Sequence, residues 1–136
     1  MTNASIIPEV GQRCVVVDDL RLAFFIGVNQ TEKLARQEVS ITVYLFVRDA
    51  GPPTSDDLGD HASYAEFVDR LKERAASLRH VNLVETLAEE VAQLALADAR
   101  VLSAVVDLRK TEIIPEAKGV GVIIHRRRGK GPADGV

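Results

Sequence analysis

From Gln37 onward the sequence alternates between two kinds of side chain, and this period of two restricts the fold more than any other feature. The odd-numbered residues are all branched and apolar: Val39, Ile41, Val43, Leu45 and Val47. The residues between them, from Ser40 to Phe46, would lie on the opposite face, because successive side chains of a strand alternate. The pattern predicts one long strand, which needs neighbouring strands and a layer that covers its apolar face.

Four other segments are rich in β-branched and aromatic residues, which favours strands. They are residues 14–17, 22–28, 101–110 and 120–125. The first two would form one bulged strand with its break near Asp18 and Asp19. A hairpin across residues 29–36 would join that strand to the one that begins at Gln37.

Two helices are predicted between these pairs of strands. Ser63 and Glu66 have the spacing of a capping box, and apolar residues recur after Ser63 at helical intervals. These apolar positions are Tyr64, Phe67, Val68, Leu71, Ala75 and Leu78. Asn82 can cap a second helix. The apolar stripe of that helix consists of Leu83, Leu87, Val91 and Leu94.

The order of elements is therefore β-β-α-α-β-β. Helices inserted between two hairpins pack on one face of an antiparallel sheet, so we expect a two-layer α+β fold with a four-stranded antiparallel sheet. We assign residues 1–126 to a single domain and expect residues 127–136 to form a flexible tail, with Arg126-Arg127-Arg128 as a solvated strand end. Strand runs such as residues 120–124 are apolar on both faces, which predicts that another copy of the protein covers the second face.

Composition narrows the classes of function. The 136 residues carry a net charge of -3, which gives no overall field that would attract nucleic acid or an anionic membrane. A single cysteine, Cys14, rules out an internal disulfide, and His61, His80 and His125 match no metal-binding spacing. We expect a cytoplasmic, metal-free protein, since no apolar run approaches the ~20 residues that span a bilayer and the N-terminus has no signal pattern.

Four strings, in this order along the chain, resemble the dihydroneopterin aldolase family of pterin enzymes, which has the tunnelling fold or T-fold. They are Ile26-Gly27-Val28 with Glu32 and Gln37; Ser55-Asp56-Asp57 with Ser63-Tyr64-Ala65; Leu83-Val84-Glu85 with Leu87-Ala88-Glu89; and Lys110 ahead of Val120-Gly121-Val122. The resemblance extends from Cys14 to Arg126. It implies a T-fold subunit and an enzyme of folate biosynthesis that cleaves a pterin side chain by a retro-aldol reaction.

Glu85 has two interpretations. A carboxylate can accept two parallel hydrogen bonds from an amide N–H and an adjacent amino group, which the pyrimidinone edge of a pterin presents. Asn82 and Glu85 also have capping-box spacing, and spacing alone favours a glutamate that only closes the helix start. The resemblance implies instead that Glu85 anchors the pterin, with the backbone of Val84 beside it.

Lys110 ends a predicted strand, and its side chain would be half desolvated because the alternate residues form an apolar face: Leu102, Ala104, Val106 and Leu108. Desolvation lowers the pKa of a lysine toward the range useful for proton transfer, although a lysine at a strand end can also extend into water. The resemblance implies that Lys110 is the general acid and base. Thr111 replaces the proline that usually follows this lysine in the family, which would leave the backbone of Lys110 less fixed.

Tyr64 would lie in the first turn of a helix, where an aromatic side chain most often only packs. Glu32 would lie in a polar hairpin loop, where a charge is usually solvated. The resemblance implies that Tyr64 relays a substrate proton. It also implies that Glu32 reaches the side-chain end of the substrate, in a site that can cross a subunit boundary.

The resemblance further implies a reaction without cofactor or Schiff base, because the dihydropterin ring contains an imine next to the bond that breaks. It implies a homo-oligomer, an octamer of two stacked tetrameric rings. Two other functions stay open. The protein could be a 2'-epimerase that acts on dihydroneopterin or its triphosphate, or an oligomer that binds a pterin without catalysis. A pathway toward a methanopterin-like cofactor could use the same chemistry.

Overall fold

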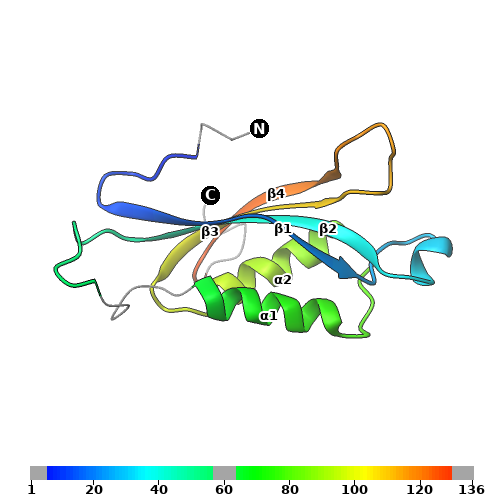
Figure 1. Ribbon diagram of the computed structural model, residues 1–136, viewed down its shortest axis with the longest axis horizontal. Helices are drawn as coiled ribbons and strands as arrows, with labels where there is room; N and C mark the ends of the chain where they lie inside the picture. The colour runs from blue at the N-terminus through cyan, green and yellow to red at the C-terminus, as the bar shows by residue number, and fades with distance from the viewer. Residues whose placement is uncertain (1–5, 57–63, 130–136) are drawn as a thin grey trace.

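The computed structural model describes residues 6–56 and 64–129, and its elements follow the predicted order (Figure 1). They are β1 (Gln12–Phe24), the 3-10 helix η1 (Thr31–Lys33), β2 (Gln37–Arg48), α1 (Tyr64–Ala76), α2 (Val84–Leu96), β3 (Val101–Lys110) and β4 (Val120–Arg127). The last strand includes Arg127, the first residue of the predicted tail. The predicted cap Ser63, His61 and the final residues 130–136 lie outside the described part of the chain.

The four strands form one antiparallel sheet in the order β1-β2-β3-β4. Figure 1 shows both helices on the same side of this sheet. Val43 of β2 pairs with Val17 of β1 and with Val106 of β3, so the register gathers apolar side chains on the helix side. The predicted two-layer α+β fold is confirmed.

The core lies between the sheet and the helices. Val39, Ile41 and Val43 of β2 have no solvent exposure, as the period of two predicts. They belong to the same buried cluster as Leu71 of α1 and Leu87 of α2. Each fully buried side chain of this size contributes roughly 1.5–3 kcal/mol relative to an exposed one, so the apolar face of β2 stabilises the fold substantially.

β1 contains the predicted bulge. Its register with β2 shifts between Val17 and Leu20, and Asp19 has a positive φ of 55°. Aspartate tolerates this conformation better than most residues do. The backbone N–H of Asp19 donates to Oγ1 of Thr42 at 3.0 Å. The bulge lets β1 pair with β2 on both sides of the break.

Several positions on the predicted apolar faces are exposed, including Tyr64 (60%) and Leu83 (49%) near the starts of the two helices. Leu78 follows the end of α1 and is 81% exposed. Leu102 is 43% exposed, because the register between β2 and β3 shifts by one residue at that point. A bulge moves side chains from one face of a strand to the other, and a simple alternation cannot show it.

The prediction that Asn82 caps α2 is wrong. The N-cap residue is Leu83, whose extended backbone (φ -116°, ψ 142°) fits that position and whose side chain makes no capping hydrogen bond. Asn82 stands one residue too early to cap the helix. Glu85 therefore does not form a capping box with Asn82.

The arginines at the end of the described chain are not all solvated, so that expectation is wrong. Arg126 forms an ion pair with Glu89 of α2, with Nε 3.0 Å from Oε1. Arg128 donates to the carbonyls of Leu96 (2.7 Å) and Asp98 (2.8 Å), at the C-terminal end of α2. A cation at this end of a helix satisfies its last carbonyls and complements its dipole. These contacts tie the end of β4 to α2.

Neither helix covers the other face of the sheet (Figure 1). Exposed apolar side chains lie on it, with Val16 49% and Ile123 56% exposed. Charged residues such as Arg21 and Arg109 share this face. That a second copy covers it stays a prediction. No helix in the described ranges is long and apolar enough to cross a membrane.

Candidate active site

Lys110, the last residue of β3, forms a largely buried ion pair with Glu32 of η1. Nζ of Lys110 lies 2.6 Å from Oε2 of Glu32, and the two side chains are 14% and 7% exposed. Lys110 pairs with Val39 of β2, a core residue, so its side chain leaves the sheet on the helix side. The fold thus brings together two of the predicted site residues that are far apart in the sequence.

Glu32 is buried, so its interpretation as a solvated loop charge is wrong. Oε2 also accepts a hydrogen bond from Nε2 of Gln37 (2.8 Å), and Oε1 accepts one from the N–H of Asn29 (3.2 Å). The hydrogen bonds from Lys110 and Gln37 lower the pKa of Glu32 to about 2. The carboxylate is therefore ionised at neutral pH, where it holds the ammonium group of Lys110 in place.

Gly27 leaves the space that the side chain of Glu32 occupies. Its φ is 132°, and a Cβ atom at this position would lie 2.3 Å from Cδ of Glu32. The N–H of Gly27 donates to the carbonyl of Val81 (3.0 Å), and its own carbonyl lies 2.7 Å from Nε2 of His80. Since a carbonyl only accepts, Nε2 of His80 carries the proton in this contact. Sequence reasoning assigned no role to Gly27, Gln37 or His80, because their contacts arise only in the folded chain.

Gly27→Ala is expected to lower the free energy of unfolding by about 2 kcal/mol, because the new methyl group would push Glu32 away from Lys110 and strain the backbone. Gly11→Ala is the matched control. Gly11 also has a positive φ, 91°, but no atom lies within 4 Å of its Cβ position. Chemical denaturation of both variants separates the clash from the strain. A Gly27→Ala protein as stable as Gly11→Ala would contradict this packing.

The first turn of α2 begins close to the ion pair. Val81 forms a bridge with Ile26, directly before Gly27. Val84 and Glu85 follow Val81 closely, so α2 starts within about 11 Å of that bridge. Glu85 is exposed and makes no hydrogen bond or ion pair within the described ranges. Its carboxylate is therefore available to a ligand.

Tyr64 is not brought to the ion pair within one copy of the chain. It is the first residue of α1 and is 60% exposed. The opposite end of α1 lies near the pair, since Arg36 donates to the carbonyls of Ala75 (3.3 Å) and Ala76 (2.9 Å), and the next residue, Gln37, contacts Glu32. The length of the helix places Tyr64 about 18 Å from that end.

Thr111 ties the chain after Lys110 to β2, contrary to the expectation that this backbone is less fixed. Its N–H donates to the carbonyl of Glu38 (3.3 Å), and its hydroxyl donates to Oε1 of Glu38 (2.7 Å). Two hydrogen bonds therefore hold the residue that follows Lys110.

The arrangement offers two kinds of chemistry. Lys110 is a positioned cationic donor that can deliver a proton or hydrogen-bond to developing negative charge. Glu85 is a carboxylate that can accept paired N–H groups from a heterocycle. Among the described residues, no group of three or more His, Cys, Asp or Glu side chains is placed to hold a metal ion.

Comparison with known proteins decides the family. The model of the dihydroneopterin aldolase family matches residues 15–125. The chain belongs to this family. The dihydroneopterin aldolase of Escherichia coli is 31% identical over 112 residues, which are 82% of this chain and 91% of that protein.

Solved structures of dihydroneopterin aldolases share the fold. The Escherichia coli enzyme in complex with neopterin has a TM-score of 0.77 and 30% identity, over 84% of this chain and 98% of that one. A Burkholderia dihydroneopterin aldolase bound to guanine has a TM-score of 0.74 and 27% identity, over 88% of this chain and 93% of that one. The four-stranded sheet with two helices is thus the T-fold of the dihydroneopterin aldolase family.

Proposed function

We propose that this protein is a dihydroneopterin aldolase of folate biosynthesis, which converts 7,8-dihydroneopterin into 6-hydroxymethyl-7,8-dihydropterin and glycolaldehyde. The observation that carries the proposal is the buried pair of Glu32 and Lys110 beside the first turn of α2, in a chain of this family. The neopterin bound to the Escherichia coli relative supports a pterin as the ligand.

Glu85 would hold the pterin ring. Its carboxylate lies in the first turn of α2 and has no partner in the described chain. The ring's amide N–H and adjacent amino group match the two carboxylate oxygens, and the backbone of Val84 lies beside them. This contact fixes the ring so that its side chain extends toward Lys110.

The reaction breaks the bond between the first and second carbons of the substrate side chain. A base takes the proton from the hydroxyl group on the second carbon. The second and third carbons then leave together as glycolaldehyde. The electrons of the broken bond move into the ring imine and form an enamine, and an acid then protonates the first carbon. Because the ring itself accepts these electrons, the chemistry needs neither a cofactor nor a Schiff base. Lys110, Tyr64 and bound water share the proton transfers, while Glu32 holds the ammonium of Lys110.

Tyr64 would act from a second copy of the chain. It lies about 18 Å from the end of α1 that is near Glu32, a distance set by the length of the helix, and it is 60% exposed. A neighbouring copy can supply it only if the protein is an oligomer. We propose the octamer of two tetrameric rings that the family resemblance implies, and sedimentation of a stable monomer at micromolar concentration would exclude it.

Subunit mixing tests the shared site. Lys110→Ala and Tyr64→Phe, each weakly active alone, are expected to regain activity when the subunits exchange. In a random equimolar oligomer about a quarter of the sites would combine an intact lysine with an intact tyrosine. The matched control mixes Lys110→Ala with Glu32→Gln, which cannot complement because one copy holds both residues. Equal behaviour of the two mixtures would show that Tyr64 does not act across the boundary.

Incubation with 7,8-dihydroneopterin tests the proposed function. Chromatography should show 6-hydroxymethyl-7,8-dihydropterin and glycolaldehyde in equal amounts. The same analysis detects the 2'-epimer, which would dominate if the protein were an epimerase. Binding of the pterin without any turnover would leave a binding protein and contradict the proposal.

A further inference from the structure

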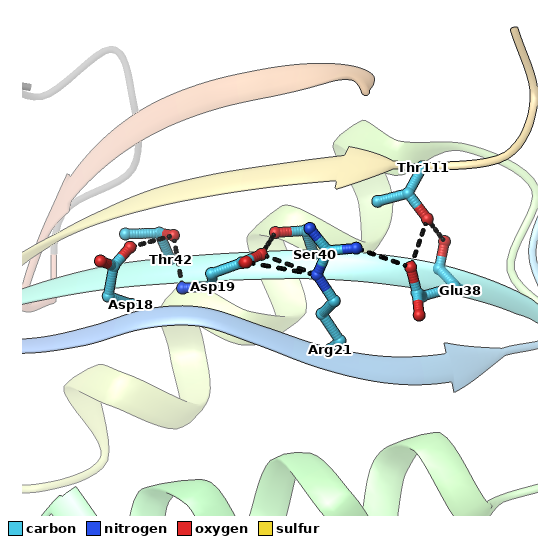
Figure 2. Close-up of polar contacts among 7 residues, drawn as sticks. All are labelled: Asp18, Asp19, Arg21, Glu38, Ser40, Thr42 and Thr111. Atoms are coloured by element: carbon cyan, nitrogen blue, oxygen red, sulfur yellow. Dashed lines mark hydrogen bonds and ion pairs between the residues drawn. The ribbon is translucent and has the colours of Figure 1, made fainter. Parts of the chain in front are cut away.

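A polar network lies on the helix-free face of the sheet, at the end of β3 that carries Lys110. Figure 2 shows its side chains crossing from β1 through β2 to Thr111, which follows Lys110. Its members are Asp18, Asp19, Arg21, Glu38, Ser40, Thr42 and Thr111. The ion pair of Lys110 and Glu32 lies on the opposite side of the sheet.

Glu38 is the centre of this network and uses three of its groups to hold the chain after β3. Its carbonyl accepts the N–H of Thr111 (3.3 Å), and its carboxylate accepts the hydroxyl of Thr111 (2.7 Å). Its own N–H donates to Oε1 of Glu112 (3.1 Å). Three hydrogen bonds to one residue of β2 therefore fix the two residues that follow Lys110.

Arg21 and Asp19 support the carboxylate of Glu38 from β1. Nη1 of Arg21 lies 3.1 Å from Oε1 of Glu38, and Nε of Arg21 lies 3.1 Å from Oδ1 of Asp19 (Figure 2). Asp19 in turn accepts the hydroxyl of Ser40 at 2.5 Å. The bulge of β1 thus directs a charged side chain along the sheet toward Glu38.

Adjacent residues of β2 hold the two ends of Lys110. Gln37 donates to Glu32, whose carboxylate holds the ammonium group. Glu38 holds Thr111 and thereby the backbone from which the lysine side chain leaves the sheet. A long flexible side chain has a defined tip only if both its partner and its backbone are fixed, because each free torsion spreads the tip over several positions.

We propose that Glu38 and Thr111 form a positioning contact that aligns Lys110 for proton transfer. The inference rests on the proposed function and adds to it two residues that do not touch the substrate. Arg21 and Glu38 are about half and more than a third exposed, at 52% and 39%. Exposed ion pairs of this kind contribute little to stability, so we expect Arg21 to support the geometry of Glu38 more than the stability of the fold.

Thr111→Val removes the hydroxyl and keeps the shape of the side chain. We expect kcat for dihydroneopterin cleavage to fall about tenfold, with KM and the melting temperature unchanged, because a small displacement of a catalytic group lowers the rate without weakening substrate binding. Thr111→Ser restores the hydroxyl and should restore kcat. Ser103→Ala is the matched control, since it removes a hydroxyl from the same sheet face at the other end of β3. It should leave kcat at the wild-type value.

Glu38→Ala tests whether the two residues act as one unit. If they do, Glu38→Ala combined with Thr111→Val should be no slower than the slower single variant, whereas independent effects would multiply. A wild-type kcat for Thr111→Val, an equal loss for Thr111→Ser, or multiplied losses in the double variant would each overturn the inference.

Amide hydrogen exchange separates this inference from the proposed function. The amides of Lys110 to Glu112 should exchange faster in Thr111→Val than in the wild-type protein, whether or not the protein cleaves dihydroneopterin. If the wild-type protein releases no glycolaldehyde, the proposed function fails and exchange alone decides the positioning contact. Unchanged exchange in Thr111→Val would overturn it.

Discussion

Lys110→Ala is expected to lower kcat for dihydroneopterin cleavage by about 10²- to 10⁴-fold, the usual contribution of a positioned acid or base. Binding of 6-hydroxymethyl-7,8-dihydropterin should change little, because the proposed work of Lys110 is to move a proton and not to hold the ring. A loss confined to kcat indicates an interaction made only in the transition state. Steady-state kinetics and titration with the product measure the two effects separately.

The control variant also removes the negative charge of Glu32, which Lys110→Ala leaves without a partner. Lys110→Ala strands the buried carboxylate of Glu32, which lowers stability. Lys110→Ala combined with Glu32→Gln should recover stability and stay as slow as the single variant. Borohydride added with substrate should leave wild-type Lys110 unmodified. A wild-type kcat in Lys110→Ala, or a trapped lysine adduct, would contradict the role assigned to Lys110.

Glu85→Ala is expected to weaken binding of 6-hydroxymethyl-7,8-dihydropterin by about 10²- to 10³-fold, because it leaves two ring donors without a charged acceptor. The melting temperature should hardly change, since Glu85 is exposed and has no partner in the described chain. Glu85→Gln keeps one acceptor oxygen and should bind with intermediate affinity. Calorimetric titration of the three proteins gives the order. Unchanged affinity in Glu85→Ala would exclude Glu85 as the pterin anchor.

The sheet could be predicted from the sequence because its physical cause is local. Side chains alternate along β2 whatever surrounds the strand, so Val39, Ile41 and Val43 identify the buried face directly. The bulge near Asp19 was also visible, since two charged residues interrupt an apolar run. Leu102 was misplaced because its position depends on a register shift relative to β2, which only the pairing partner determines.

The site could be predicted less well from the sequence because its central ion pair joins residues that are far apart along the chain. Glu32 lies in a polar loop by sequence, yet it is buried because Gly27 leaves room for it and Lys110 and Gln37 surround it. None of these contacts has a sequence period. The resemblance named Glu32, Tyr64, Glu85 and Lys110 as site candidates, but it could not show that Tyr64 lies at the end of α1 that is far from the ion pair.

A gain in stability alone does not explain the buried ion pair of Glu32 and Lys110. Removing two charges from water has a desolvation penalty that their attraction offsets only in part, and apolar replacements are often as stable. Here two further hydrogen bonds, from Gln37 and Asn29, satisfy Glu32. The chain thus maintains a satisfied polar cluster at the edge of its core, as expected where a lysine must hold one position.

Cleavage of 7,8-dihydroneopterin in D2O tests the central claim most directly. The account predicts that the bond between the first two side-chain carbons breaks and that the enamine then takes one proton from solvent through the site around Lys110. Mass spectrometry should therefore find one deuterium on the hydroxymethyl carbon of the product, and none on the carbons of an equal amount of glycolaldehyde. Absence of glycolaldehyde, or a hydroxymethyl product without carbon-bound deuterium, would contradict the account.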